Sequence, residues 1–383
     1  MNNWLWIFNG FLSLFLLGLC DNIRGPIFPQ ILEQFGLTDF AGSLFFAIGS
    51  GASFFGSLVT PAFTRQWGEL RSMQVFQLIM GLSMGALVIC ESYWQMLIFV
   101  AIFGVTLGAL SVLQSSVVAA GSSRAQRSRW LAGLHSMYGL ASFLAPLFLK
   151  FFWVWDRALA ALAGVCVVLS VGAFFSVKRH KKISPLDAEN ASSDSTSLAR
   201  MSWLAPTVLA TYVVSELAIS TRLALFLQRQ EAFSVRDASV WVSLFFALLL
   251  CGRLCFFFLR VESSIRYIVL VSQSVALVSF LAGLMYRPEA FLICGLAMAP
   301  IYPLYVAHLS SLYNSKDLQK ILGRCLCIQA FMVVAMHLGL GWLSDQFGLR
   351  QALFIGPFAM LLSLLAFFRY EVAANRSWFK KMI

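Results

Sequence analysis

The sequence predicts an all-α membrane protein. Hydrophobic residues make up 60% of its 383 residues and charged residues only 12%, with a mean hydropathy of +0.80. So few charged side chains cannot cover the surface of a soluble globule of this length. Apolar runs of about 20 residues, the length of helix that crosses about 30 Å of hydrocarbon, recur along the whole chain. They lack the alternating pattern of strands in a membrane barrel.

The apolar runs divide into two sets of six. In chain order they cover approximately residues 5–28, 40–60, 74–91, 95–119, 131–152, 158–177, 203–228, 239–259, 266–286, 290–313, 325–344 and 351–370. The first follows no basic leader and is too long for a signal peptide, so we expect an uncleaved helix. A stretch rich in Ser, Asp and Asn separates the sets and is typical of a flexible linker. The predicted parts are a six-helix bundle at 1–177, a cytoplasmic linker at 178–201 and a second bundle at 202–383.

The basic residues predict the orientation of these helices. Most of the 28 Lys and Arg residues fall in loops on one side, which the positive-inside rule assigns to the cytoplasm together with both chain ends. The net charge of +11 therefore reflects topology and contact with anionic lipid headgroups. Because these charges are dispersed over short loops, they do not predict binding to nucleic acid. We expect a monomeric, multi-pass protein of a bacterial inner membrane.

Two arginines lie at matching depths of the two halves. Arg24 follows Trp4 by about 20 residues, and Arg222 follows Trp203 by about the same number. A guanidinium inside hydrocarbon costs at least about 3 kcal/mol on insertion scales, so its presence needs a reason. The simplest reason is a watery path between the helices. The pair therefore favours a transporter built from two repeats.

Two short apolar patterns bear on helix packing and on the repeat. Leu44–Ala47 in the second run matches Leu244–Ala247 in the eighth, residue for residue. Gly104 and Gly108 in the fourth run have the G-x-x-x-G spacing, which predicts close packing of that helix against a neighbour better than it predicts a ligand site.

A polar motif near the end of the chain carries a family resemblance. The segment Gly341–Arg350 resembles the G-x-L-x-D-x-x-G-x-R pattern that major facilitator transporters place in tight loops between helices. A degenerate copy follows the second run, with Arg65 where the acid usually stands, before Gly68. The resemblance spans the chain and implies two pseudo-symmetric six-helix bundles that work by alternating access. It assigns a gating role to Gly341, Asp345, Gly348 and Arg350.

A narrower resemblance rests on three short patches. Cys20–Gln30, His135–Gly139 and Gly295–Met298 with the following Tyr302–Pro303 look like the first, fifth and tenth helices of the fucose permease branch of that superfamily. The branch imports sugars together with protons, so the patches imply a similar activity.

The acids of that branch are missing here. Its carboxylates in the first and fourth helices correspond to Gly25 and Gln114 in this chain. Asp21 lies one helical turn from Gly25 and could substitute, but only in a new arrangement. Proton-coupled sugar import therefore cannot be carried over from the resemblance.

Two interpretations of Arg24 remain open. Asp21 and Arg24 are three residues apart and share a helix face, so they could form a structural ion pair. Alternatively Arg24 and Arg222 converge on an anionic group, because a guanidinium binds carboxylate or phosphate through paired hydrogen bonds. Organic-anion exchangers of the superfamily use arginines of their first and seventh helices in this way. The candidate solute-binding residues are Arg24, Arg222, Asn22, Gln114, Tyr138 and Tyr302.

Four residues are candidates for binding a coupling proton. Glu216 lies in the middle of an apolar run, where it could carry a proton or pair with Arg222 or Arg253. Imidazole groups titrate near neutral pH, although in a membrane they are often only donors of interhelical hydrogen bonds. The candidates are Asp21, Glu216, His135 and His308.

The remaining motifs exclude several classes of protein. The eight cysteines have no companion ligands for zinc, and the sequence contains no nucleotide-binding loop, nucleophile elbow or haem motif. We therefore expect no metal, no cofactor and no enzymatic activity. The predicted function is secondary transport of a small polar or anionic solute, coupled to protons or a counter-solute. A proton-coupled sugar importer, a lipid or drug exporter and a non-transporting receptor remain alternatives.

Overall fold

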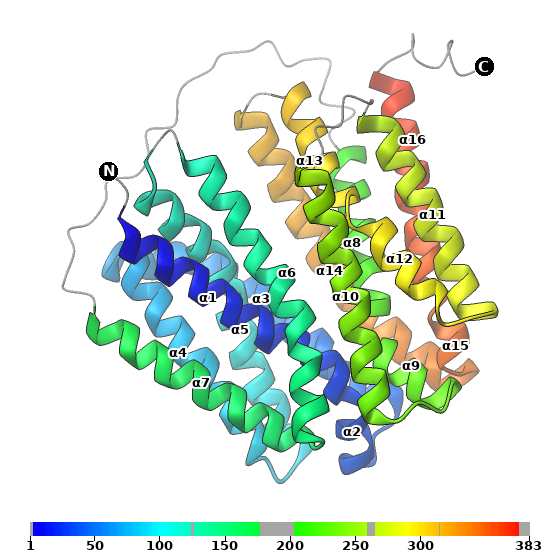
Figure 1. Cartoon of the computed structure of the whole chain (residues 1–383), viewed down its shortest axis with the longest axis horizontal. Coiled ribbons are helices and arrows are strands. Elements are labelled where there is room, and N and C mark those ends of the chain that lie inside the picture. The colour runs from blue at the N-terminus through cyan, green and yellow to red at the C-terminus, as the bar shows by residue number, and fades with distance from the viewer. Residues whose placement is uncertain (1–2, 124–125, 177–202, 259–264, 314, 375–383) are drawn as a thin grey trace. The chain divides into compact units, whose positions relative to one another are not determined.

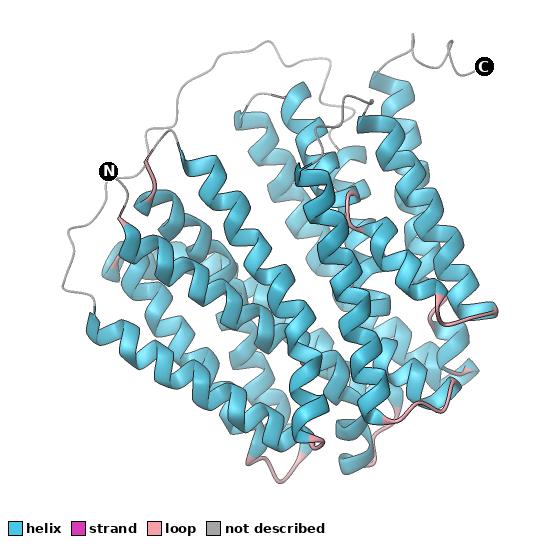
Figure 2. Ribbon diagram, viewed as in Figure 1, coloured by secondary structure: helices cyan, strands magenta, loops and turns pink. Residues whose placement is uncertain are grey.

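The structure is a computed structural model that describes residues 3–123, 126–176, 203–258, 265–313 and 315–374. In these ranges the chain forms helices joined by short turns, and no strand is present (Figures 1 and 2). The predicted linker at 178–201 lies outside them, as do residues 1–2 and 375–383.

The helices differ in length, and several follow one another with almost no turn between them. In chain order they are α1 (Trp4–Asn22), α2 (Arg24–Phe35), α3 (Asp39–Trp67), α4 (Glu69–Val88), α5 (Tyr93–Gly121), α6 (Arg127–Phe152), α7 (Trp155–Ser176), α8 (Leu204–Ser220), α9 (Leu223–Gln230), α10 (Val235–Phe258), α11 (Ile265–Met285), α12 (Ala290–Met298), α13 (Ile301–Leu312), α14 (Ser315–Phe347), α15 (Leu349–Ala352) and α16 (Ile355–Ala374).

These helices account for the predicted membrane spans. Within the described ranges, ten helical segments are long and apolar enough to cross a membrane, and the pair α8–α9, bent by 42°, makes eleven. The segment Trp4–Phe35 contains α1 and α2, and Ala290–Leu312 contains α12 and α13. With α4, which has 20 residues, the helices agree with about twelve spans. The prediction of an all-α membrane protein is confirmed.

The chain groups into two compact units. Unit 1 comprises Met1–Leu186 and Thr221–Ala247, and unit 2 comprises Asp187–Ser220 and Leu248–Ile383. The chain therefore passes from unit 2 to unit 1 between α8 and α9, and returns within α10. The predicted bundle boundary at 178–201 stays a prediction, because α9 is grouped with unit 1.

Close helix packing in unit 1 depends on small residues. Helix α5 packs along α3, while α1 packs against α5 and α6, and α4 against α5 and α7. A Cβ atom on Gly108 would lie 1.7 Å from the backbone oxygen of Ser53, and one on Gly104 would lie 2.4 Å from that of Gly49. The predicted packing role of the G-x-x-x-G spacing is confirmed, because only hydrogen fits at these contacts.

Unit 2 packs around helix α8. This helix contacts α14 and α16, and α11 contacts α12, α13 and α16. An apolar core of α8, α13, α14 and α16 residues includes Val208, Leu309, Ile321 and Phe367. Three tyrosines join this core, and they bring hydroxyl groups into an otherwise apolar region: Tyr305, Tyr313 and Tyr370.

Two glycine turns have nearly the same geometry in the two units. Gly68, between α3 and α4, has φ 80° and ψ 161°, and Gly348, between α14 and α15, has φ 91° and ψ 157°. This region of backbone space is accessible almost only to glycine. The preceding residues, Arg65-Gln66-Trp67 and Asp345-Gln346-Phe347, also correspond in position. The turns support the interpretation of both segments as copies of one motif.

We predict that Gly108→Ala destabilises the protein, because the added methyl group must push α5 away from α3. Overpacking of this kind costs about 1–3 kcal/mol. Thermal unfolding of the purified protein in detergent measures the effect.

The matched control is Gly164→Ala in α7, where an added Cβ atom meets nothing within 4 Å. There alanine should stabilise the helix by up to about 1 kcal/mol. Equal unfolding midpoints for the two variants would contradict the packing role of Gly108.

Candidate functional site

Interruptions of three helical spans bring polar groups to the middle of apolar helices. The first span breaks at Ile23 between α1 and α2, the seventh at Thr221–Arg222 between α8 and α9, and the tenth at Ala299–Pro300 between α12 and α13. Arg24 is the first residue of α2, and Arg222 is the N-cap residue of α9. The two arginines therefore occupy corresponding places in the two repeats. Ile23 and Ala299 keep α-helical dihedral angles, and of the three interruptions only that between α8 and α9 bends the span by more than 40°.

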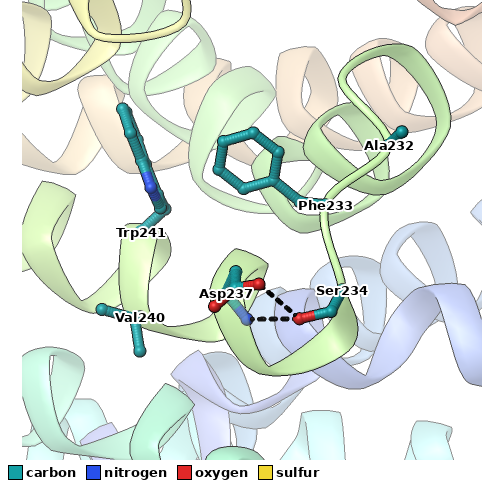
Figure 3. Close-up of a pocket in the computed structure, with 6 residues that line it drawn as sticks. All are labelled: Ala232, Phe233, Ser234, Asp237, Val240 and Trp241. Carbon is teal, nitrogen blue, oxygen red and sulfur yellow. Dashed lines mark hydrogen bonds between the residues drawn. The ribbon is translucent and has the colours of Figure 1, made fainter.

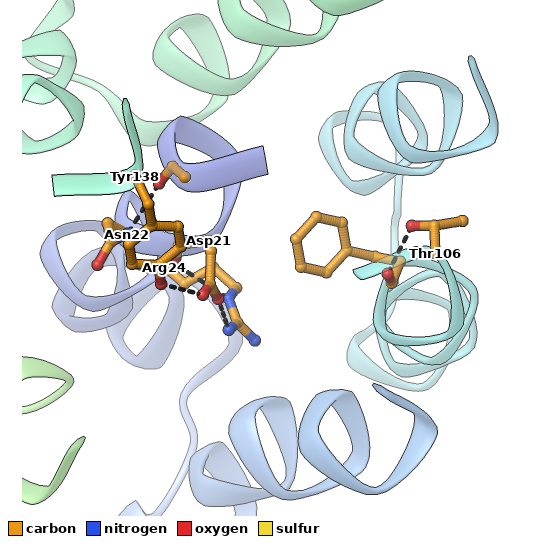
Figure 4. A network of polar contacts seen from close by, with 7 residues as sticks. Asp21, Asn22, Arg24, Thr106 and Tyr138 are labelled. Carbon is orange, nitrogen blue, oxygen red and sulfur yellow. Dashed lines mark hydrogen bonds and ion pairs between the residues drawn. The ribbon is translucent and has the colours of Figure 1, made fainter. Parts of the chain in front are cut away.

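An acidic residue, an arginine and a tyrosine meet at the first interruption (Figure 4). The Asp21 carboxylate forms an ion pair with the Arg24 guanidinium, and it accepts a hydrogen bond of 2.7 Å from the Tyr138 hydroxyl of α6. The Asn22 amide donates to the Gly18 carbonyl oxygen at 2.8 Å. Three helical segments, α1, α2 and α6, are thereby joined through one carboxylate. The structural ion pair is the arrangement that this conformation adopts.

The Arg24 pair is largely shielded from solvent. The Arg24 and Asp21 side chains are 12% and 19% exposed. The rings of Phe103 and Phe46 lie 5.3 Å and 5.7 Å from the Arg24 guanidinium carbon. Such ring faces stabilise a cation and also exclude water, which strengthens the ion pair.

Arg222 is more deeply buried than Arg24. Its residue is 2% exposed, and its guanidinium carbon lies 4.3 Å from the Phe28 ring centroid and 4.5 Å from that of Phe46. Nη2 donates to the Ser43 hydroxyl at 2.9 Å, whereas Nη1 makes no hydrogen bond within the described structure. Arg24 and Arg222 thus both contact the ring of Phe46. The buried Nη1 keeps a donor available for an anionic or polar group.

A second ion pair of unit 1 fixes α9 to the start of α3. Arg229 Nη1 lies 2.8 Å and 2.9 Å from the two carboxylate oxygens of Asp39, the first residue of α3. A carboxylate at a helix N-terminus is also favoured by the helix dipole. Helix α9 packs against α2 in the same region. Sequence reasoning missed this pair, because both residues fall one position outside the predicted apolar runs.

A cluster of similar chemistry lies in unit 2. The Tyr212 hydroxyl donates to Glu216 Oε2 and lies 3.0 Å from the Met298 carbonyl oxygen at the end of α12. Arg253 Nη2 of α10 lies 3.5 Å from Glu216 Oε1. The Tyr302 ring packs against that of Tyr212, with centroids 6.4 Å apart. Of the two predicted partners of Glu216, the structure places Arg253 beside it.

The remaining candidates lie apart from these clusters. Gln114 is 1% exposed and donates to the Ser13 hydroxyl at 3.0 Å, so it joins α5 to α1. His135 is exposed on α6. His308 is buried in unit 2, where its Nε2 lies 2.6 Å from Glu371 Oε1. The structure therefore brings Asp21, Asn22, Arg24 and Tyr138 together, but it does not add Gln114 or His135 to them.

The residues with a predicted gating role surround the turn between α14 and α15. Gly341 is buried within α14, Asp345 is exposed near its end, and Gly348 forms the turn itself. Arg350 follows in α15 and is half-buried.

Two surface pockets lie near α9 and not at the clusters. One, of about 350 Å³, surrounds the start of α10, where Ser234 Oγ accepts from the Asp237 N–H and donates to Asp237 Oδ2 (Figure 3). These bonds cap the helix. The Phe233 and Trp241 rings pack against each other nearby, with their centroids 5.5 Å apart. The other pocket, of about 370 Å³, includes Arg229 and the end of α2.

In the described part of the chain, no group of three or more His, Cys, Asp or Glu residues could hold a metal ion.

Comparison with known proteins agrees with the first resemblance. The family model described as Major Facilitator Superfamily matches residues 10–324. A bacterial homolog of the human lysosomal transporter Spinster, in an inward-facing and occupied conformation, has a TM-score of 0.77 at 10% identity, over 95% of this chain and 96% of that one. A D-xylose-proton symporter has a TM-score of 0.78 at 12% identity, over 97% and 98%. At such identities the likeness shows the fold alone. No curated protein sequence matches the chain.

We predict that the Asp39–Arg229 pair contributes to stability. Asp39→Asn and Arg229→Gln should each lower the unfolding midpoint, and their coupling energy in a double-mutant cycle should be about 1 kcal/mol. The exposed Asp317–Lys320 pair of α14, with an N–O distance of 3.5 Å, is the control and should couple more weakly. A coupling energy no larger than that of the control would refute the contribution.

Proposed function

The chain belongs to the major facilitator superfamily and is a membrane transporter, not an enzyme, and we propose that it moves a small polar or anionic solute by alternating access. The driving force is a proton gradient or a counter-solute. One observation carries the proposal: the ion pair and hydrogen bond that join Asp21, Arg24 and Tyr138 at the break in the first span. A charged cluster in hydrocarbon is costly, so its presence indicates a functional role.

The chemistry of this cluster suggests how a proton and a solute are coupled. While Asp21 is ionised, its carboxylate forms an ion pair with the Arg24 guanidinium, which is then not available to a solute. Protonation of Asp21 removes the charge that holds Arg24, and the guanidinium can then bind an anionic group of the solute by paired hydrogen bonds. Tyr138 and Asn22 lie beside the pair and would contact the polar part of the solute. Binding of the anion and binding of the proton thus favour each other.

Arg222 would complete the solute site from the second repeat. Its Nη1 makes no hydrogen bond in the described structure, and it shares the Phe46 ring with Arg24. A small solute with one or two anionic groups could contact both guanidiniums after a rearrangement of Phe46. Alternating access would require α9 to move relative to α3, which breaks the Arg229–Asp39 pair and the Arg222–Ser43 hydrogen bond.

The cluster of unit 2 would serve as a second place for the coupling proton. Glu216 is 19% exposed and, like Asp21, is held by an arginine and a tyrosine. Tyr302 packs beside it. A change in the protonation of Glu216 would alter its hold on Arg253, and hence the contact between α8 and α10.

The membrane setting and the partners follow from the same interpretation. We propose a monomer in a bacterial inner membrane with both termini in the cytoplasm, and with no cofactor or metal. Its partners are the solute, protons or a counter-solute, and lipids. The gating role of Asp345, Gly341, Gly348 and Arg350 also remains a proposal, supported by the glycine turn.

Alternative substrates make different demands on the site. The fucose permease branch remains a proposal that rests on the three patches, and sugar import would lack its two acids, since Gly25 and Gln114 stand at those positions. Lipid or drug export and a receptor without flux are further alternatives. A thermal-shift screen with monosaccharides, monocarboxylates, dicarboxylates and sugar phosphates separates them, because a ligand at 100 times its Kd stabilises the protein by about 2.7 kcal/mol.

We predict that Arg24→Ala and Arg222→Ala each weaken binding of the best ligand from this screen and slow its flux in proteoliposomes. Loss of one charge-assisted hydrogen bond costs about 1.5–3 kcal/mol, or roughly tenfold to hundredfold in affinity. The control is Arg236→Ala at the exposed start of α10, which should transport like the wild type. Wild-type rate and affinity in both site variants would disprove the paired-arginine site.

We predict that Asp21→Asn abolishes acceleration of flux by a pH gradient but preserves exchange of solute for solute. The neutral amide mimics a permanently protonated acid, so Arg24 stays available while no proton is carried. Glu216→Gln tests the second acid in the same assay. Asp156→Asn, at the start of α7, is the control. Undiminished acceleration in either variant removes that acid as a proton carrier.

A further inference from the structure

A buried charged cluster of unit 2 lies outside the solute site described above. Glu371 of α16 is fully buried, although it carries a carboxylate. His308 Nε2 of α13 lies 2.6 Å from its Oε1, and Arg266 Nε of α11 lies 3.1 Å from its Oε2. The three residues thus join three helices through one carboxylate, at the end of unit 2 that the charge distribution assigns to the cytoplasm.

We propose that His308, Glu371 and Arg266 form a proton-binding site, and that Tyr305 and Tyr302 of α13 connect it to Glu216. The site is new with respect to the solute site, and its ligand is a proton that exchanges with the cytoplasm. Its link to flux rests on the proposed function, whereas proton binding itself does not.

The charges of the cluster support a site that gains and loses a proton. With His308 neutral, Glu371 and Arg266 balance each other; a proton on His308 adds one positive charge beside the carboxylate. His308 lies in the last turn and a half of α13, where the helix dipole favours a cation. Imidazole is the side chain that changes its charge near neutral pH. Because the His308 and Glu371 side chains are only 7% and 0% exposed, water screens this change little.

In the part of the chain that the structure describes, the surroundings of the cluster are mainly apolar and aromatic. Among the described residues, the titratable side chains around His308 and Glu371 include Arg266 of α11, Tyr305 of α13, Tyr370 of α16, Tyr313 after α13 and Cys325 of α14. Helix α8 contributes the apolar side chains of Ala205, Val208 and Leu209. Imidazole and carboxylate are therefore the pair that exchanges a proton near neutral pH.

Helix α13 carries a row of polar side chains from this site toward Glu216. Tyr302 packs on Tyr212, which donates to Glu216, and the Tyr305 and His308 rings lie 6.4 Å apart. The three residues of α13 are spaced by three positions, about 4.5 Å of helix for each step.

Unused hydrogen-bonding capacity lies along this row. In the described structure the hydroxyl of Tyr305 is buried and makes no hydrogen bond. Tyr305 Oη can therefore donate to or accept from water molecules that carry a proton between Glu216 and His308.

Purified protein tests the site without any solute. Thermal unfolding of the wild type should rise in midpoint from about pH 8 to about pH 6, because a proton on the folded cluster places a cation 2.6 Å from the Glu371 carboxylate. His308→Gln should lose this rise. Glu371→Gln, which keeps the size of the side chain, should lose it too.

The matched control is His337→Gln, which also removes a buried histidine of unit 2. His337 lies on α14 twelve positions beyond Cys325, about 18 Å along the helix. A pH-dependent rise that survives in His308→Gln, or that disappears equally in His337→Gln, would overturn the site. Histidine NMR of the wild type gives a second reading that needs no stable variant of Glu371: absence of a titrating His308 signal between these pH values would also overturn it.

Flux measurements test the connection. Tyr305→Phe should lower proton-driven uptake at least threefold and leave solute exchange unchanged, whereas Tyr370→Phe, which removes the hydroxyl that donates to Tyr313, should change neither. Equal proton-driven uptake in wild type and Tyr305→Phe overturns the connection. If no solute is transported at all, the proposed function fails, and the unfolding measurements still decide whether the site binds a proton.

Discussion

Pairing of charge inside an apolar helix bundle is the constraint on which the rest of this structure depends. A carboxylate in such a place needs donors for both oxygens, and Asp21 and Glu216 each meet this need with an arginine and a tyrosine. In unit 1 Asp21 pairs with Arg24 and accepts a hydrogen bond from Tyr138. In unit 2 Glu216 pairs with Arg253 and accepts one from Tyr212. The similarity lies in the chemistry and not in the positions, because Tyr138 comes from a different helix than Asp21, while Tyr212 lies one turn before Glu216 on the same helix.

The interruptions of the helices and the charged side chains explain each other. A break at membrane depth leaves backbone groups without partners within the helix, and polar side chains can satisfy them. At the end of α12 the Met298 carbonyl oxygen accepts a hydrogen bond from Tyr212, whose hydroxyl also serves Glu216. Breaks in the first and seventh spans similarly place Arg24 and Arg222 at the starts of short helices, where their guanidiniums meet the Phe46 ring.

Sequence reasoning recovered the spans, the matched arginines, the ion pair of Asp21 with Arg24 and the tight contact at Gly108, because each depends on local spacing or composition. It missed Asp39, Arg229 and Glu371 for a physical reason. Hydropathy defines a span by the absence of charge, so charged residues that the fold pairs at helix ends fall just outside the predicted runs. Their partners lie 190 and 63 positions away in the chain, and only tertiary packing brings them together. Arg266, at the first position of its run, gave no signal of its role.

The same pairing constrains the class of solute. A neutral solute that displaced Asp21 from Arg24 would leave a poorly solvated carboxylate without its guanidinium, and breaking a buried ion pair in this way costs about 3–5 kcal/mol. An anionic solute replaces the lost charge at Arg24, and a proton on Asp21 removes the need for one there. Both changes together keep the cluster neutral throughout, whereas either alone leaves an unbalanced charge. Cotransport of an anion with a proton is therefore the mode of transport with the smallest cost in electrostatic free energy at this cluster.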